Sequence, residues 1–278
     1  MANYTTADIK ELRERTGAGM MDVKKALDEA DGDTAKALEI IRVKGLNKAS
    51  KREGRATAEG LVAAKVVDGA GYMLELNAET DFVAKNEKFV ELANKALDAA
   101  VANNVADVDA LLAAKIGENT VAEEIEELSG VLGEKIQLRR IEKVEGPLVK
   151  AYLHKTSQDL PAQVGVLFAV DGTGEAAETA AHDVAVHAAA MAPVYLTRED
   201  VPEDLVAEER RIAEETARAE GKPEQALPKI IDGRMTGFFK EKVLVDQPFA
   251  KDTKQSIQQV LDAAGAKAVA FARFRVGA

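Results

Sequence analysis

The same order of two strands and one helix occurs twice in this sequence, and that order limits the folds open to the chain. The first unit has strands at Gly60–Val67 and Tyr72–Asn77, the turn Asp68–Gly71 between them, and a helix at Glu87–Val101. The second has strands at Leu148–His154 and Gln163–Val170, the turn Asp171–Gly174, and a helix at Glu175–Met191. The connections are too short for crossovers, so we expect antiparallel pairing and a sheet face buried against each helix. The sequence predicts an α+β fold with a duplicated antiparallel-sheet-plus-helix core.

Further core elements lie between and after these units. Residues Ala122–Leu132 have a helical pattern, and Lys135–Val144 alternate well enough for a strand. The last part of the chain predicts a short strand at Lys242–Val245, a turn at Gln247–Phe249, a helix at Ser256–Ala264 and a strand at Val269–Val276.

Residues 1–45 predict a compact module of three helices. Thr6 is suited to cap the first helix, and Gly17 to end it with a left-handed residue. The turn Asp31–Asp33 separates the second helix from the third, which Gly45 closes.

The module is followed by a basic segment. The whole chain has a net charge of −11, which argues against broad nucleic-acid binding. Residues 42–55, by contrast, contain six basic side chains and one acidic side chain. The segment is either a solvated linker or a contact strip for an acidic partner surface.

Residues 193–233 differ from the core in composition. Val201–Glu220 is rich in Glu, Arg and Ala, the triplet Gly221–Pro223 breaks it, and Glu224–Ile231 runs back. This order predicts an antiparallel helical hairpin that protrudes and packs mostly on itself. A dimer contact is the alternative interpretation.

These patterns divide the chain into four parts. The division is an N-terminal module with its basic linker at 1–55, a first core repeat at 56–144, a second core repeat at 145–192 and 234–278, and the hairpin insertion at 193–233.

Met20 and Met21 are candidates for a binding surface. They cannot both face the core of so small a module if the second helix starts near Asp22. Methionine suits adaptable binding surfaces, but it is as common as a gap filler in cores. The pattern leaves both hypotheses open.

The segment Thr80–Val83 places a carboxylate and an aromatic ring at a strand-to-helix connection. Asp81 is suited to cap a helix, and Phe82, seven residues before Phe89, would share its buried face if the helix began early. Alternatively, Asn86 caps the helix and leaves Asp81 and Phe82 on an exposed turn. The pattern favours neither.

The sequence motifs do not indicate a catalytic site. The sequence has neither a phosphate-binding loop nor a dinucleotide fingerprint, and it has no cysteine. We interpret His182 and His187 as structural, because a spacing of five does not align them on one helical face. We therefore expect no enzyme activity, cofactor, bound metal or catalytic residue. We also expect a cytoplasmic protein, since no export signal or membrane-length apolar stretch is present.

Two long motifs resemble signatures of a known family. Residues Leu12–Leu27 (LRERTGAGMMDVKKAL) and Glu75–Lys85 (ELNAETDFVAK) are similar to the two signatures of elongation factor Ts, the bacterial-type nucleotide exchange factor for elongation factor Tu. The resemblance extends over nearly all of the chain. It implies a ubiquitin-associated-type N-terminal module and a protruding coiled-coil insertion.

The resemblance also implies which residues bind the partner. They are Arg13, Met20 and Met21 with Arg52 nearby, then Thr80, Asp81, Phe82 and Val83, then Leu132 and Gly133 in a turn beside the Phe, and finally His154. Asp81 and Phe82 are suited to disturb the magnesium–GDP site of elongation factor Tu. We expect this GTPase as the partner, in a one-to-one complex or a dimer of heterodimers, and neither membrane nor nucleic-acid binding.

Overall fold

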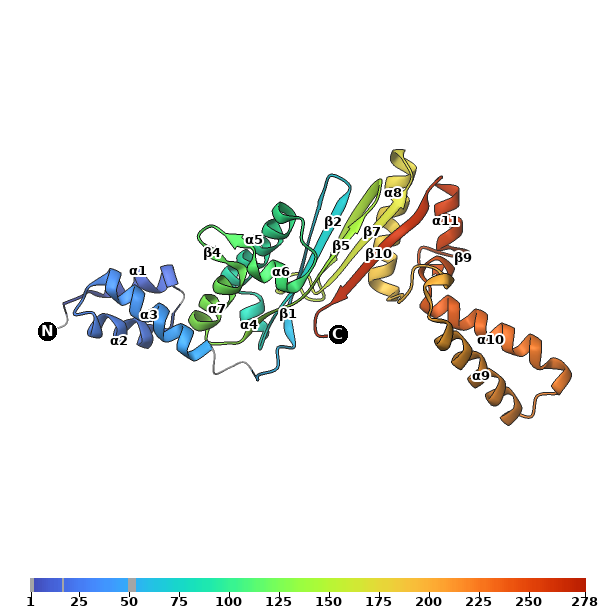
Figure 1. The fold of residues 1–278 in the computed structure, drawn as a ribbon, viewed down its shortest axis with the longest axis horizontal. Helices are drawn as coiled ribbons and strands as arrows, with labels where there is room; N and C mark the ends of the chain where they lie inside the picture. The colour runs from blue at the N-terminus through green and yellow to red at the C-terminus, as the bar shows by residue number, and fades with distance from the viewer. Residues whose placement is uncertain (1–2, 17, 50–53) are drawn as a thin grey trace.

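The computed structural model describes residues 3–16, 18–49 and 54–278, and its fold is α+β as predicted. Figure 1 shows the N-terminal helices at one end, the helices α9 and α10 at the other, and the sheets between them. Gly17 and Arg52, for which we predict a helix end and a partner contact, lie outside the described residues.

The N-terminal helices are α1 (Thr6–Thr16), α2 (Met20–Glu29) and α3 (Thr34–Ala49). They bury Leu12, Val23, Leu27 and Ile41 against one another. Three boundaries differ from the sequence-based prediction. Thr5 caps α1 instead of Thr6, because the Thr5 hydroxyl accepts from the Asp8 amide at 3.3 Å while the Asp8 carboxylate accepts from the Thr5 amide at 2.6 Å. Helix α2 begins before Asp22, and α3 continues past Gly45.

The core contains a sheet of β1 (Glu59–Val67), β2 (Ala70–Ala78) and β5 (Ile136–Glu145), and a sheet of β6 (Leu148–His154), β7 (Val164–Asp171) and β10 (Lys267–Arg275). Their strand orders are β1-β2-β5 and β10-β7-β6, and every neighbouring pair is antiparallel. The predicted antiparallel pairing is confirmed.

The core is layered, with helices outside both sheets and the sheets packed face to face (Figure 1). Helices α5 (Glu87–Asn103) and α7 (Val121–Leu132) cover the first sheet, whereas α8 (Gly174–Met191) and α11 (Ile257–Ala263) cover the second. Side chains alternate accordingly, so that Leu61 faces the helices and Val62 faces the other sheet.

Strand β7 is buried on both faces, which explains why its sequence is a continuous apolar run. The sheets approach closely at Gly165. A Cβ atom there would lie 2.5 Å from Val62 Cγ1 and 2.7 Å from Met73 Sδ, so only glycine permits this distance between the sheets.

Smaller elements complete the core. Helix α6 (Val108–Ala113) and the short strands β3 (Lys115–Ile116) and β4 (Asn119–Thr120) connect α5 to α7, and none of them is predicted from the sequence. The strands β8 (Pro248–Phe249) and β9 (Asp252–Ser256) precede α11. In the part of the chain that the structure describes, no helix combines the length and apolar character needed to cross a membrane.

The hairpin consists of α9 (Glu203–Ala219) and α10 (Leu227–Lys242), and it projects away from the sheets (Figure 1). Helix α10 extends well past the predicted end at Ile231. Leu227, Ile231 and Met235 recur every four residues in one buried cluster. The burial of this stripe outweighs the low helix propensity of Gly233 and Gly237.

The predicted strand at Lys242–Val245 is wrong. Val243 makes only an isolated bridge to Tyr195, and Leu244–Asp246 form a 3₁₀ turn. The reason is the extended α10, which uses the residues up to Lys242 in its last turn.

Candidate functional site

The candidate site is a short turn between β2 and α5. Helix α4 (Asp81–Ala84) has only four residues, and Thr80 precedes it in extended conformation. Helix α5 then starts separately, because the Asn86 side chain accepts from the Lys88 amide at 3.0 Å. The helical phase is therefore interrupted between α4 and α5.

This interruption separates the environments of the two phenylalanines. Phe82 is 73% exposed, whereas Phe89 is fully buried. The interpretation in which both rings share one buried face is wrong, and the exposed-turn interpretation is confirmed for Phe82. Val83 and Ala84 are buried in the core and anchor the turn to it. Val83, which we predict at the partner contact, thus points inward in this structure.

Asp81 and Phe82 both interact with Lys85. The Lys85 ammonium lies 3.5 Å from Asp81 Oδ2 and 4.5 Å from the centroid of the Phe82 ring. The side chains of Lys85 and Asp81 are 38% and 47% exposed and Phe82 is 73% exposed, and such exposed pairs stabilise a fold only weakly. The cluster therefore remains free to exchange its contacts for those of another molecule.

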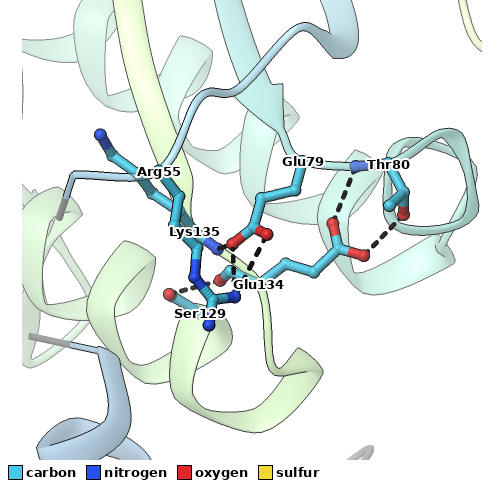
Figure 2. Close-up of polar contacts among 6 residues, drawn as sticks. All are labelled: Arg55, Glu79, Thr80, Ser129, Glu134 and Lys135. Carbon is cyan, nitrogen blue, oxygen red and sulfur yellow. Dashed lines mark hydrogen bonds and ion pairs between the residues drawn. The ribbon is translucent and has the colours of Figure 1, made fainter. Parts of the chain in front are cut away.

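A second turn lies beside the first (Figure 2). Gly133 ends α7 with a φ of 84°, a left-handed conformation that favours glycine. The following residue, Glu134, accepts hydrogen bonds from the Thr80 amide at 2.9 Å and from the Thr80 hydroxyl at 2.6 Å. The predicted neighbourhood of the Leu132–Glu134 turn and the Thr80 segment is thus observed.

Each of the two turns also provides a carboxylate that accepts a backbone hydrogen bond from the other turn. Glu79 Oε1 accepts from the Lys135 amide at 2.7 Å, and both Glu79 oxygens lie 3.2 Å from Arg55 Nη1 (Figure 2). No sequence pattern identifies Arg55, Glu79, Glu134 or Lys135 as site residues. Their partners are far away in the chain, so hydrophobic periodicity gives no signal for them.

The N-terminal module presents the other candidate residues. Met20 and Met21 are 57% and 63% exposed, and Arg13 is exposed as well. The inward positions of α2 belong to Val23, Ala26 and Leu27. The hypothesis that the methionines fill gaps in the core is therefore wrong.

The histidines differ in environment. His154 is exposed at the end of β6, where its Nδ1 lies 3.3 Å from the Tyr152 hydroxyl. The Tyr152 ring also contacts the exposed His182 ring, with 6.1 Å between the centroids. His187 is buried and hydrogen-bonded on both ring nitrogens, which confirms its structural interpretation.

Among the residues that the structure describes, His, Asp and Glu side chains form no group of three or more suited to hold a metal ion. An exposed ring on an anchored turn, together with exposed methionines on a separate module, is typical of a protein that binds another macromolecule. The fold and the site therefore define an α+β protein with candidate binding surfaces on both its N-terminal helices and its core.

Comparison with known proteins gives the family. A sequence model described as "Elongation factor TS" matches residues 79–278. The elongation factor Ts of Renibacterium salmoninarum is 73% identical over 278 residues, and the alignment covers 100% of both chains. Those of Arthrobacter sp. strain FB24 and Acidothermus cellulolyticus are 69% and 58% identical, with 100% of this chain and 100% and 99% of the relatives covered. The chain belongs to the elongation factor Ts family. Membership implies nucleotide exchange on elongation factor Tu in translation elongation.

Proposed function

We propose that this protein binds elongation factor Tu in its GDP form and releases the nucleotide by distorting the magnesium site, so that GTP can bind. The observation that carries the proposal is the Phe82 ring, which is 73% exposed on a turn whose neighbours Val83 and Ala84 are buried. An exposed ring on a rigid base is suited to enter an apolar crevice of a partner.

The energetics support a wedge. Burial of a Phe side chain contributes roughly 1.5–3 kcal/mol, which offsets distortion elsewhere in the complex. Magnesium demands near-ideal octahedral geometry, so a small displacement of its surroundings weakens nucleotide binding strongly. Asp81, next to the ring, supplies a carboxylate that competes for groups organising the metal site. By linkage, a partner that prefers the nucleotide-free state lowers nucleotide affinity by the same factor.

Other contacts extend the proposed interface. Arg13, Met20 and Met21 would dock on the nucleotide-binding domain of the partner, with Arg52 nearby. Leu132 and Gly133 would contact the partner beside Phe82, and His154 would contact another of its domains. In this proposal the protein works in the cytoplasm, and it makes and breaks no covalent bond itself. The complex is one-to-one or a dimer of heterodimers, which light scattering distinguishes.

The test is the release of labelled GDP from elongation factor Tu. We expect Phe82→Ala to leave the fold intact, because the ring is exposed, and to lower the stimulated release rate by roughly 10-fold or more. Ile212→Ala, which truncates an exposed apolar side chain in α9, is the matched control and should release GDP as fast as the unaltered protein. Unchanged release with Phe82→Ala would refute the wedge.

A further inference from the structure

Helix α4 has too little structure of its own to hold Phe82. A helix of four residues is far below the length at which helices are stable alone, so outside contacts must fix it. At its C-terminal side, the buried Val83 and Ala84 and the Asn86 cap supply such contacts. At its N-terminal side, Thr80 occupies the cap position, but its side chain makes no cap hydrogen bond to α4.

Glu134 supplies the missing contact. Its carboxylate accepts from both the amide and the hydroxyl of Thr80, at 2.9 and 2.6 Å (Figure 2). The residue pair is partly buried, and hydrogen bonds to a charged acceptor are the stronger kind. Because Thr80 directly precedes Asp81 and Phe82, these bonds fix the position from which both side chains project.

Glu134 is itself held by α7. The Ser129 hydroxyl donates to the Glu134 carbonyl at 2.5 Å, and the Gly133 amide donates to the Ser129 carbonyl at 3.0 Å. Glu79, the residue before Thr80, accepts from the amide of Lys135, the residue after Glu134. Each turn thus donates a backbone hydrogen bond to a carboxylate of the other turn.

We propose that Glu134 is a positioning residue for nucleotide exchange, holding Thr80 so that Phe82 and Asp81 are presented to the partner in one orientation. The inference rests on the proposed function of Phe82. Without Glu134 the N-terminal side of α4 frays, and only a fraction of molecules presents the ring correctly. The apparent affinity for the partner falls by that fraction, while the maximal exchange rate of the assembled complex changes little.

The experiment compares Glu134→Ala, Glu134→Gln and Glu126→Ala. Glutamine keeps an oxygen that accepts from the Thr80 amide, and its NH₂ group can donate to the Thr80 hydroxyl. Glu134→Gln should therefore avoid the defect expected of Glu134→Ala. Glu126 is an exposed residue on α7, the helix that precedes the Glu134 turn, and is the matched control. For Glu134→Ala we expect about a 5- to 10-fold rise in the concentration that gives half-maximal GDP release, with the maximal rate within about 2-fold. The other two variants should resemble the unaltered protein.

A double variant separates positioning from general damage. If Glu134 acts through Phe82, then Glu134→Ala raises the half-maximal concentration for GDP release less in Phe82→Ala than in the unaltered protein. Additive losses would overturn the proposal. Glu134→Asp, which keeps the charge but is one methylene too short for the same contacts, gives the same test if the alanine variant does not fold.

Amide hydrogen exchange of the free protein makes the result independent of the partner. In Glu134→Ala the amides of residues 80–85 should exchange their hydrogens faster than in Glu126→Ala. Unchanged protection would overturn the positioning role, whatever GDP release shows. Faster exchange together with normal half-maximal concentrations would overturn the link to function. If instead Phe82→Ala itself releases GDP normally, the proposed function fails, and the hydrogen-exchange result still decides whether Glu134 holds the turn.

Discussion

His187 in α8 joins two segments that are far apart in the sequence. Its Nδ1 accepts from the Ala250 amide at 3.1 Å, so the proton must reside on Nε2. Nε2 then donates to Gln247 Oε1 at 2.9 Å. The ring is buried, and burial lowers its pKa from the ordinary value of 6.5. The neutral imidazole therefore holds the chain in place where it returns from α10 to the core.

This pKa shift predicts a pH dependence of stability. The unfolded chain protonates His187 near pH 6.5, whereas the folded chain resists protonation. The contribution of His187 is complete above that pH and is lost as the pH falls below it. We expect the free energy of unfolding, measured in urea, to fall between about pH 7 and pH 5 more steeply in the unaltered protein than in His187→Gln. His182→Gln, at an exposed site, is the control. Equal slopes for all three proteins would contradict this.

Met20 and Met21 give a second prediction at the scale of the residue. Both side chains are exposed, so Met20→Ala and Met21→Ala should change the free energy of unfolding by no more than about 0.5 kcal/mol. If they lie at the partner contact, each truncation should weaken binding of elongation factor Tu several-fold, since methionine contributes adaptable apolar area. Calorimetry of binding and thermal unfolding of the same variants compare the two effects. A larger effect on stability than on binding would be inconsistent with a contact role.

At the scale of the element, the pair α9 and α10 is attached to the core at one place. The Val194 and Tyr195 amides both donate to the Lys242 carbonyl, at 2.8 and 3.0 Å, so the chain enters and leaves the hairpin side by side. The hairpin buries its own cluster of Ala213, Ala217, Leu227, Ile231 and Met235. Its apolar interior is separate from the clusters of the sheets.

This attachment predicts that the hairpin is dispensable for folding of the core. We expect that replacing residues 203–240 with a short Gly/Ser linker leaves the sheets folded. The variant should then still unfold in one cooperative thermal transition, which circular dichroism measures. Deleting residues 267–278, which removes β10, should abolish the transition, because β10 pairs with β7 and contributes Ala272 and Phe274 to the packing between the sheets. Loss of the transition in the first variant would show that the hairpin supports the core.

At the scale of the whole molecule, the N-terminal helices rest on the core through a partly polar junction. Lys88 Nζ donates to the Arg15 carbonyl at 3.0 Å, and Arg42 lies 3.3 Å from Glu127. A hollow of about 270 Å³ remains between the two parts. Burial lowers the pKa of Lys88, so part of the attraction is offset by desolvation.

The junction should therefore loosen when these contacts are removed. We expect Arg42→Ala combined with Lys88→Ala to increase the radius of gyration measured by X-ray scattering while the core unfolds at the same temperature. Lys10→Ala, which removes a pair with Glu14 inside α1, is the control and should leave the radius unchanged. An unchanged radius in the double variant would indicate that apolar contacts alone hold the module.

Much of this fold is determined by sequence, because alternation and helical periodicity depend on neighbouring residues. The strands β1, β2, β6 and β7 and the helices α5, α7 and α8 lie within a few residues of their predicted ranges. The motif Thr80–Val83 is also visible in the sequence. Its exposure is not, because the same residues fit a buried helix start equally well.

Tertiary structure decided the rest. The end of α10 depends on a buried stripe shared with α9, and the mounting of Phe82 depends on Glu134, which is 54 residues from Thr80 in the chain. Periodicity reports which face of an element is apolar, but it contains no information about which two turns the packed sheets and helices bring within hydrogen-bond distance.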